Sequence, residues 1–135
     1  ENELYTLVGS LCQKSADLGF APAQGMLGEA HLQKSPILQE HSEECGLTLL
    51  ECSAAQDFTP ALVTLAQYYL NNGNTTVALT YLLRAADKDN IDAIEILALV
   101  YLYGSGTIEA NPSLAKYYTK KLKALQKKNA GCSIL

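Results

Sequence analysis

The last four residues of the sequence, Cys132-Ser133-Ile134-Leu135, have the most specific chemical pattern in the chain. They follow the Cys-a-a-X form that protein prenyltransferases recognise, and a terminal Leu favours transfer of a geranylgeranyl group to the cysteine sulfur. Ile at the second "a" position favours modification, whereas Ser at the first is a mild departure. We therefore expect Cys132 to be a lipidation site and a prenyltransferase to be a partner.

Lysines precede this motif with no acidic residue among them. Residues 112–135 have a formal charge of +6, whereas residues 1–111 have a charge of −10. Four of the lysines fall at i, i+4, i+7 and i+11 and so share one side of a helix. One lipid chain binds a membrane weakly, and each lysine near an anionic surface adds about 1 kcal/mol. We therefore expect an anionic membrane to face Lys116, Lys120, Lys123, Lys127 and Lys128.

Other kinds of chemistry are poorly represented. The acidic body and the lack of arginine in the basic segment argue against nucleic acid as a partner. The cysteines form no C-x-x-C motif and are not spaced with the two histidines as metal ligands, so we expect no metal and no cofactor. Neither histidine has a nucleophile or carboxylate at catalytic spacing, so we expect no enzymatic activity.

Two cysteines, Cys12 and Cys45, occupy positions that are apolar elsewhere in the chain. We expect them to lie in the core. Cys52 aligns with basic residues and is expected to be exposed. The Gly104-Ser105-Gly106 segment follows a helical pattern and lacks the Lys and Ser/Thr of a phosphate-binding loop, so we interpret it as a turn.

A segment that recurs three times indicates how the chain positions these residues. It reads SADLGFAPA from Ser15, SAAQDFTPA from Ser53 and AADKDNIDA from Ala85. In each copy a helix ends in small residues, a polar turn follows and a new helix begins. The alignment then continues through Leu27-Gly28, Leu65-Ala66 and Leu97-Ala98, each followed three residues later by His31, Tyr69 or Tyr101. The small residue is expected to let two helices approach closely.

Helical periodicity extends through the whole sequence, and no alternating strand pattern interrupts it. We expect an all-α fold, a short right-handed solenoid of antiparallel helix pairs. It would contain about seven helices, arranged as a leading half-repeat (Leu4–Asp17) and three repeats. The solenoid is expected over residues 1–128, with a last helix over 112–128, and a tail over residues 129–135.

No apolar run is long enough to span a bilayer, and the first residues show no signal-peptide pattern. Together with the terminal Cys-a-a-X motif, this predicts a location on the cytosolic face of a membrane.

The stretch YLYGSGTIEANPSLAKYY, over residues 101–118, resembles the Sel-one-like repeat, a relative of the tetratricopeptide repeat. The third unit carries the pattern through Ala93, Leu97, Tyr101, Gly104, Gly106, Ala115, Tyr117 and Tyr118. The second keeps Ala61, Leu65, Tyr69, Gly73, Ala78 and Tyr81 with a shorter loop. The first keeps Ala23, Leu27 and Gly28, but it has His31 in place of the tyrosine and a divergent loop, LQKSPILQEHSEE. The resemblance covers nearly the whole chain.

This resemblance implies a non-catalytic adaptor that holds a protein or peptide segment in a concave groove, lined by the first helix of each pair. The positions carried over are Gly25, Glu29, Gln33, Val63, Gln67, Asn71, Glu95, Leu99 and Tyr103. They mix apolar and polar groups with two carboxylates and no basic residue. Such a surface would suit a partner segment with Lys or Arg beside an apolar anchor.

Three overall interpretations remain open. Prenylation is eukaryotic chemistry, whereas proteins resembling the Sel-one-like family are abundant in bacteria, so the two features together suggest a bacterial effector that is lipidated inside a host cell. The alternative is a fragment of a longer structural or envelope scaffold without lipidation. A third is an enzyme similar to the cysteine-rich bacterial branch of the family, for which β-lactam hydrolysis has been suggested. The cysteines here do not repeat in register as in that branch.

Overall fold

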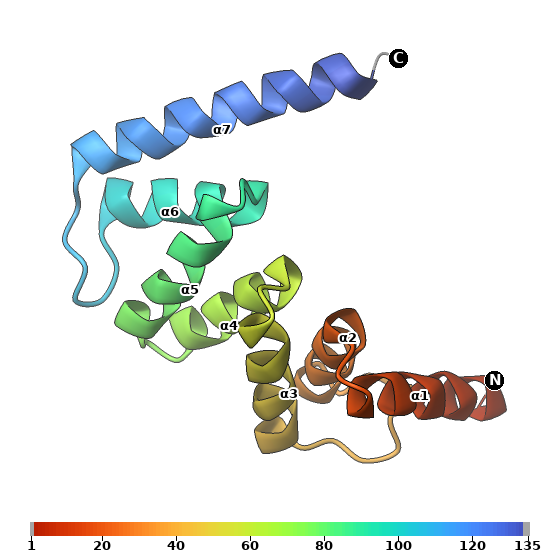
Figure 1. Cartoon of the computed structure of the whole chain (residues 1–135). Helices are drawn as coiled ribbons and strands as arrows, with labels where there is room; N and C mark the ends of the chain where they lie inside the picture. Colours follow the sequence, from red (N-terminus) through yellow and green to blue (C-terminus); the bar gives the residue numbers. More distant parts are fainter. Residues whose placement is uncertain (1, 134–135) are drawn as a thin grey trace. The chain divides into compact units, whose positions relative to one another are not determined.

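The computed structural model describes residues 2–133 (Figure 1), which form seven helices and no β-strand. The helices are α1 (Asn2–Asp17), α2 (Ala21–Leu32), α3 (Glu43–Ala55), α4 (Thr59–Asn71), α5 (Thr75–Asp87), α6 (Ile91–Tyr103) and α7 (Pro112–Ser133). The all-α fold expected from the sequence is confirmed. The chain divides into two compact units, and the division falls within α4, between Leu65 and Ala66.

The three recurring sequence segments form the same turn. A residue with positive φ follows each helix, at Gly19 (86°), Asp57 (60°) and Asp89 (59°). In each turn its N–H bonds to the carbonyl oxygen three residues back at 2.9 Å, and the next N–H bonds to the carbonyl five residues back at 3.2 Å. This pair of bonds satisfies carbonyl groups that the helix end leaves open. Glycine adopts this conformation freely, and aspartate tolerates it better than most residues.

In the N-terminal unit, α2 and α3 are in very close contact at two glycines. A Cβ atom on Gly28 would lie 2.7 Å from the carbonyl oxygen of Gly46, and one on Gly46 would lie 2.9 Å from the carbonyl oxygen of Gly28. Leu27 and Leu50 beside this contact are fully buried. The close approach expected from the small residue after Leu27 is therefore confirmed for this helix pair.

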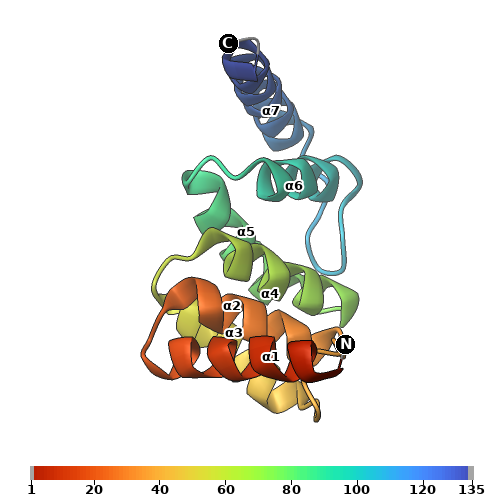
Figure 2. The same ribbon diagram turned by 90° about the vertical axis from the view of Figure 1, so that its right-hand side faces the viewer.

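A buried polar network joins α1, α2 and α3, which lie together in Figure 2. The Ser53 hydroxyl donates to the carbonyl oxygen of Ala21 at 2.7 Å. The Gln24 amide donates to the carbonyl of Ala16 at 3.3 Å and accepts from Gln56 at 2.8 Å. Each of these buried groups has a partner, as burial of polar groups requires.

The divergent loop between α2 and α3 is folded back on its own unit. Ser42 donates its backbone N–H to Nδ1 of His31 at 3.1 Å, and Nε2 of His41 lies 2.8 Å from the carbonyl oxygen of Ser35. The carbonyl of Ile37 lies directly against Gly9 of α1. His31, which replaces the tyrosine of the other repeats, therefore acts here as a hydrogen-bond acceptor for the loop.

In the C-terminal unit, stacked tyrosines join the helices. Tyr69 stacks on Tyr81 with ring centroids 6.0 Å apart, and Tyr101 stacks on Tyr118 at 5.9 Å. Burial of the Tyr118 phenol, reinforced by the neighbouring Tyr101, Tyr117 and Asp87, raises its pKa. These rings are the family-pattern residues of the second and third repeats, and they fill the space beside the small residues.

The Gly104-Ser105-Gly106 segment forms a tight loop between α6 and α7. Gly104 and Gly106 have φ values of 76° and 56°. The backbones of Ser105 and Ile108 bond to each other twice at 2.9 Å, and the Asn111 N–H reaches the carbonyl of Tyr101 at 2.7 Å. The loop closes the helix pair by these bonds, as the interpretation of a turn predicted.

Helix α7 is longer than expected from the sequence. It continues to Ser133, whereas a tail was expected from residue 129. No proline follows Pro112 at the start of the helix, and residues 113–131 have no positive φ, so the helix continues through Asn129 and Gly131. Residues 129–133 therefore extend the helix that carries the lysines.

Candidate functional site: an exposed surface on the C-terminal unit

The groove residues expected in the N-terminal unit differ in exposure, since two of them are buried, whereas Glu29 is half-buried and Gln33 is exposed. Gly25 is buried beside the Phe58 ring, and a Cβ atom added to it would lie 3.0 Å from that ring. Val63 is only 8% exposed. These two residues pack the core rather than line an open groove. Glu29 accepts a hydrogen bond from Gln33 at 2.8 Å, so the two polar side chains are paired with each other along α2.

The expected groove residues of the C-terminal unit are open to solvent. Gln67 and Asn71 are exposed on α4, and Glu95 is exposed on α6. Leu99 is 56% exposed and Tyr103 is 77% exposed.

A neighbouring residue, Leu102, is 50% exposed and was missed in the sequence analysis. Together Leu99, Leu102 and Tyr103 form one face of α6 at i, i+3 and i+4, which we name the α6 apolar stripe. The spacing of Leu102 from Leu99 in an almost wholly apolar helix was the signal that could have revealed it.

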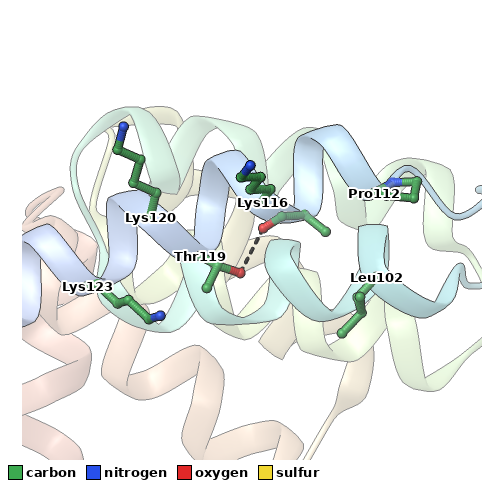
Figure 3. Close-up of a pocket in the computed structure, with 7 residues that line it drawn as sticks. Leu102, Pro112, Lys116, Thr119, Lys120 and Lys123 are labelled. Atoms are coloured by element: carbon green, nitrogen blue, oxygen red, sulfur yellow. Dashed lines mark hydrogen bonds between the residues drawn. The ribbon is translucent and has the colours of Figure 1, made fainter.

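A hollow of about 410 Å³ lies between α6 and α7, next to this stripe (Figure 3). We name it the α6–α7 hollow, and it is lined by Leu102, Pro112, Ala115, Lys116, Thr119, Lys120 and Lys123. Leu102 comes from α6, and all other lining residues come from residues 112–123 of α7. The Thr119 hydroxyl donates to the carbonyl oxygen of Ala115 at 2.7 Å, so its hydroxyl hydrogen is already used within α7.

The hollow carries positive charge without a counter-charge. No acidic residue lines it, and within residues 3–131 Lys116, Lys120 and Lys123 have no ion pair or hydrogen bond through their ammonium groups. Lys121 differs, because its ammonium lies 3.5 Å from an Asp89 carboxylate oxygen and donates to the carbonyl of Ala86 at 3.2 Å. Lys121 thus stabilises the helix contact, whereas the other three are available to a partner.

The described part of the chain contains no cluster of three or more His, Cys, Asp or Glu side chains that could hold a metal ion. Cys12 is half-buried against the core of the N-terminal unit, and Cys52 is exposed. The expectation that Cys45 lies in the core is wrong, because it is exposed in a hollow shared with His31 and Leu49. The imidazole is smaller than the tyrosine ring of the other repeats, and it leaves this space unfilled.

The Cys-a-a-X motif falls at the limit of the structure. Ile134 and Leu135 lie outside the described residues, and Cys132 and Ser133 are described only as the backbone end of α7. Lys127 and Lys128, one to two turns before them, are exposed. Among residues 2–133 no helix is both long and apolar enough to cross a membrane.

Comparisons with known proteins identify the fold. No family model and no curated protein sequence matches the chain. A solved Sel1 repeat protein from Oxalobacter formigenes superposes with a TM-score of 0.75 at 20% identity, covering 86% of this chain and 89% of that one. An immunity protein from Pseudomonas aeruginosa superposes with a TM-score of 0.72 at 29% identity over 86% of this chain. This chain spans 45% of that protein. The fold is therefore that of a Sel1 repeat protein.

Proposed function

We propose that this chain is a non-catalytic protein-binding module that captures a partner segment on the α6 apolar stripe. The observation that carries the proposal is the exposure of three large apolar side chains on one face of a single helix: 56% for Leu99, 50% for Leu102 and 77% for Tyr103. Exposed apolar groups that cluster in this way are typical of interaction surfaces, whereas scattered ones are not. The Sel1 repeat fold supports a module of this kind.

The chemistry of the stripe suggests how a partner would be held. Tyr103 offers a large amphipathic ring at low conformational cost, and aromatic side chains of this kind are enriched among the residues that dominate binding energies. Leu99 and Leu102 extend the apolar contact, and Glu95 ends it with a carboxylate on the same side of α6. A partner segment with an apolar anchor therefore fits, with a basic residue at the Glu95 end.

A comparative pull-down tests this proposal. The double variant Leu99→Ser/Tyr103→Ser should lose the partner proteins that the wild-type chain captures from cell extract, identified by quantitative mass spectrometry. Both positions are exposed, so the fold should be retained, and circular dichroism checks it. Leu18→Ser is the matched control, since Leu18 is an 88% exposed leucine in the other unit. Equal capture by the wild type and the double variant would refute the proposal.

For a chain whose native end is Leu135, we propose geranylgeranylation of Cys132 and attachment to the cytosolic face of a membrane. Lys127 and Lys128 would supplement the lipid by attraction to anionic headgroups. Labelling with a geranylgeranyl analogue in a eukaryotic cell, with Cys132→Ser as the control, tests this. Label on the wild type alone supports it, whereas equal labelling of both chains or label on neither excludes it.

Modification by a eukaryotic prenyltransferase together with the fold of a bacterial Sel1 repeat protein supports a role as a bacterial effector in a host cell. The alternative function is that of a segment in a longer repeat scaffold that is never lipidated. The codon after Leu135 in the native gene distinguishes them, because a further coding sequence would leave the cysteine internal and outside the reach of a prenyltransferase.

A further inference from the structure

The open face of α7 corresponds to a buried face in the preceding repeat. In the repeat alignment, Ala115 and Tyr118 of α7 match Ala78 and Tyr81 of α5. The same alignment makes Thr119 equivalent to Leu82 and Lys123 equivalent to Ala86. Leu82 is fully buried, Ala86 is 1% exposed, and the next helix packed against α5 is α6.

On α7 the corresponding Thr119 and Lys123 are exposed. The face of α7 that matches a helix-covered face of α5 is thus left uncovered in the described chain, and it lines the α6–α7 hollow.

The floor of the hollow is suited to an apolar side of a helix. Leu102 and Pro112 supply exposed apolar surface, and Ala115, itself only 4% exposed, is small enough to let a helix approach the α7 backbone closely. A second helix laid in this position would cover Leu102, half of which is exposed. The helix-in-groove mode of recognition requires this combination of an apolar floor and a hollow between two helices.

The rim of the hollow selects the charge of the occupant. Lys116, Lys120 and Lys123 stand at i, i+4 and i+7, a row about 10 Å long, or two helical turns. A helix with carboxylates at the same spacing can meet all three. Such exposed pairs contribute more to association rate and specificity than to affinity, which the apolar floor would supply.

A flat membrane surface fits the hollow less well than a helix does. Headgroups could reach the lysine ammonium groups, but a planar surface would leave the recessed apolar floor uncovered. Lys127 and Lys128 lie on α7 beyond the hollow and remain the residues assigned to the membrane.

We infer that the α6–α7 hollow binds an acidic amphipathic helix of a partner protein. This inference rests on the proposed protein-binding function and adds to it the helical form and the charge of the partner. The helix would bury its apolar side on Leu102 and Pro112 and pair its carboxylates with Lys116, Lys120 and Lys123.

Fluorescence anisotropy with a synthetic helix tests the inference. The probe is a fluorescein-labelled, alanine-rich helix of about 18 residues, with a leucine stripe flanked by three glutamates at i, i+4 and i+7. A matched peptide carries glutamine at the three positions. We expect the wild-type chain to bind the glutamate helix roughly tenfold more tightly than the glutamine helix at low salt.

Three variants locate the binding. Lys116→Glu/Lys120→Glu/Lys123→Glu should lose the preference for glutamate, whereas Lys127→Glu/Lys128→Glu, a matched reversal on the same helix, should retain affinity within about twofold. Leu102→Ser should weaken binding of both peptides. Equal affinity for the two peptides, or an equal effect of both charge reversals, would overturn the inference.

Two further outcomes separate this inference from its alternatives. If the triple reversal abolishes binding to vesicles containing about 30% phosphatidylserine and leaves peptide binding unchanged, the lysines serve a membrane and the inference is wrong. If the Leu99→Ser/Tyr103→Ser variant loses partner capture while the triple reversal retains it, the proposed function holds without this inference.

Discussion

Close packing of α2 on α3 depends on Gly28 and Gly46, which have a hydrogen atom in place of a side chain. At Gly28 an added Cβ would meet the backbone oxygen of Gly46 at 2.7 Å, and a backbone atom cannot move aside as the end of a side chain can. We predict that Gly28→Ala lowers the free energy of unfolding by about 1–3 kcal/mol, measured by urea denaturation. Gly131→Ala, in a helix with nothing within 4 Å, should be neutral or slightly stabilising. Similar losses in both variants would contradict this explanation.

His31 makes the stability of the N-terminal unit sensitive to pH. Burial, and secondarily the neighbouring His41, lowers the pKa of His31 from its ordinary value of 6.5. Its Nδ1 accepts a hydrogen bond from Ser42 and must lose that bond when protonated. As the pH falls through about 6.5, the unfolded chain binds the proton before the folded chain does, so stability falls with it.

We therefore predict that the wild-type melting temperature decreases between about pH 7.5 and pH 5.5 by more than that of His31→Gln. His41→Gln keeps the His31 imidazole and its burial and removes only the smaller effect of His41, so it should retain most of the wild-type decrease. Differential scanning fluorimetry measures the melting temperature of each variant at each pH. If the melting temperatures of the wild type and His31→Gln change in parallel with pH, His31 does not control the pH dependence.

At the scale of elements, the loop between α6 and α7 couples to the start of α5. A Cβ on Gly106 would lie 2.6 Å from the Thr75 hydroxyl oxygen, and Thr75 is buried. Thr76 and Thr107 also share a hydrogen bond at 3.2 Å. The loop thus closes its own helix pair and packs on the preceding one.

We predict that Gly106→Ala destabilises the C-terminal unit by about 2–3 kcal/mol, the sum of left-handed backbone strain and the clash with Thr75. Gly73→Ala has a similar positive φ but nothing within 4 Å, so it should cost only about 1 kcal/mol. Chemical denaturation followed by far-ultraviolet circular dichroism distinguishes the two. Equal losses would mean that backbone strain alone is responsible.

The elements differ in how far the sequence predicts them. The three turns after α1, α3 and α5 were predictable, because their hydrogen bonds close within the recurring segments themselves. The loop between α2 and α3 was not, since it is held by His31 and by contact with Gly9, which lie outside it. The extra length of α7 was missed because Asn129 and Gly131 are residue types that commonly end helices, and in this structure they do not.

The candidate surface was partly predictable for a similar reason. The exposure of Leu99 and Tyr103 followed from their repeat positions, and their role as binding residues stays a prediction. The burial of Gly25 and Val63 depends on how Phe58 and its neighbours pack, which spacing does not reveal. The α6–α7 hollow depends on contact between two helices, so the lysine row alone could not indicate it.

At the scale of the whole molecule, we expect each of the two compact units to be stabilised mainly by contacts within itself. Repeat folds are stabilised mainly by neighbouring contacts, so a change should be felt locally. Tyr118 stacks on Tyr101 within the C-terminal unit. We predict that Tyr118→Ala lowers protection there by about 1–3 kcal/mol and leaves α1, α2 and α3 unaffected. Hydrogen–deuterium exchange with mass spectrometry measures this, and a uniform loss of protection along the chain would contradict it.

The exposed lysines of α7 also bear on self-association. A helix that left leucine and alanine uncovered at the positions of Leu82 and Ala86, which are buried on α5, would offer other copies a ready place to stack. Head-to-tail contacts of that kind do not close and can grow into filaments. The row of ammonium groups keeps this face hydrated, because burying three unpaired charges against the apolar face of another copy would be costly. The same three side chains that would select an acidic helix therefore also oppose polymerisation of the chain at this face.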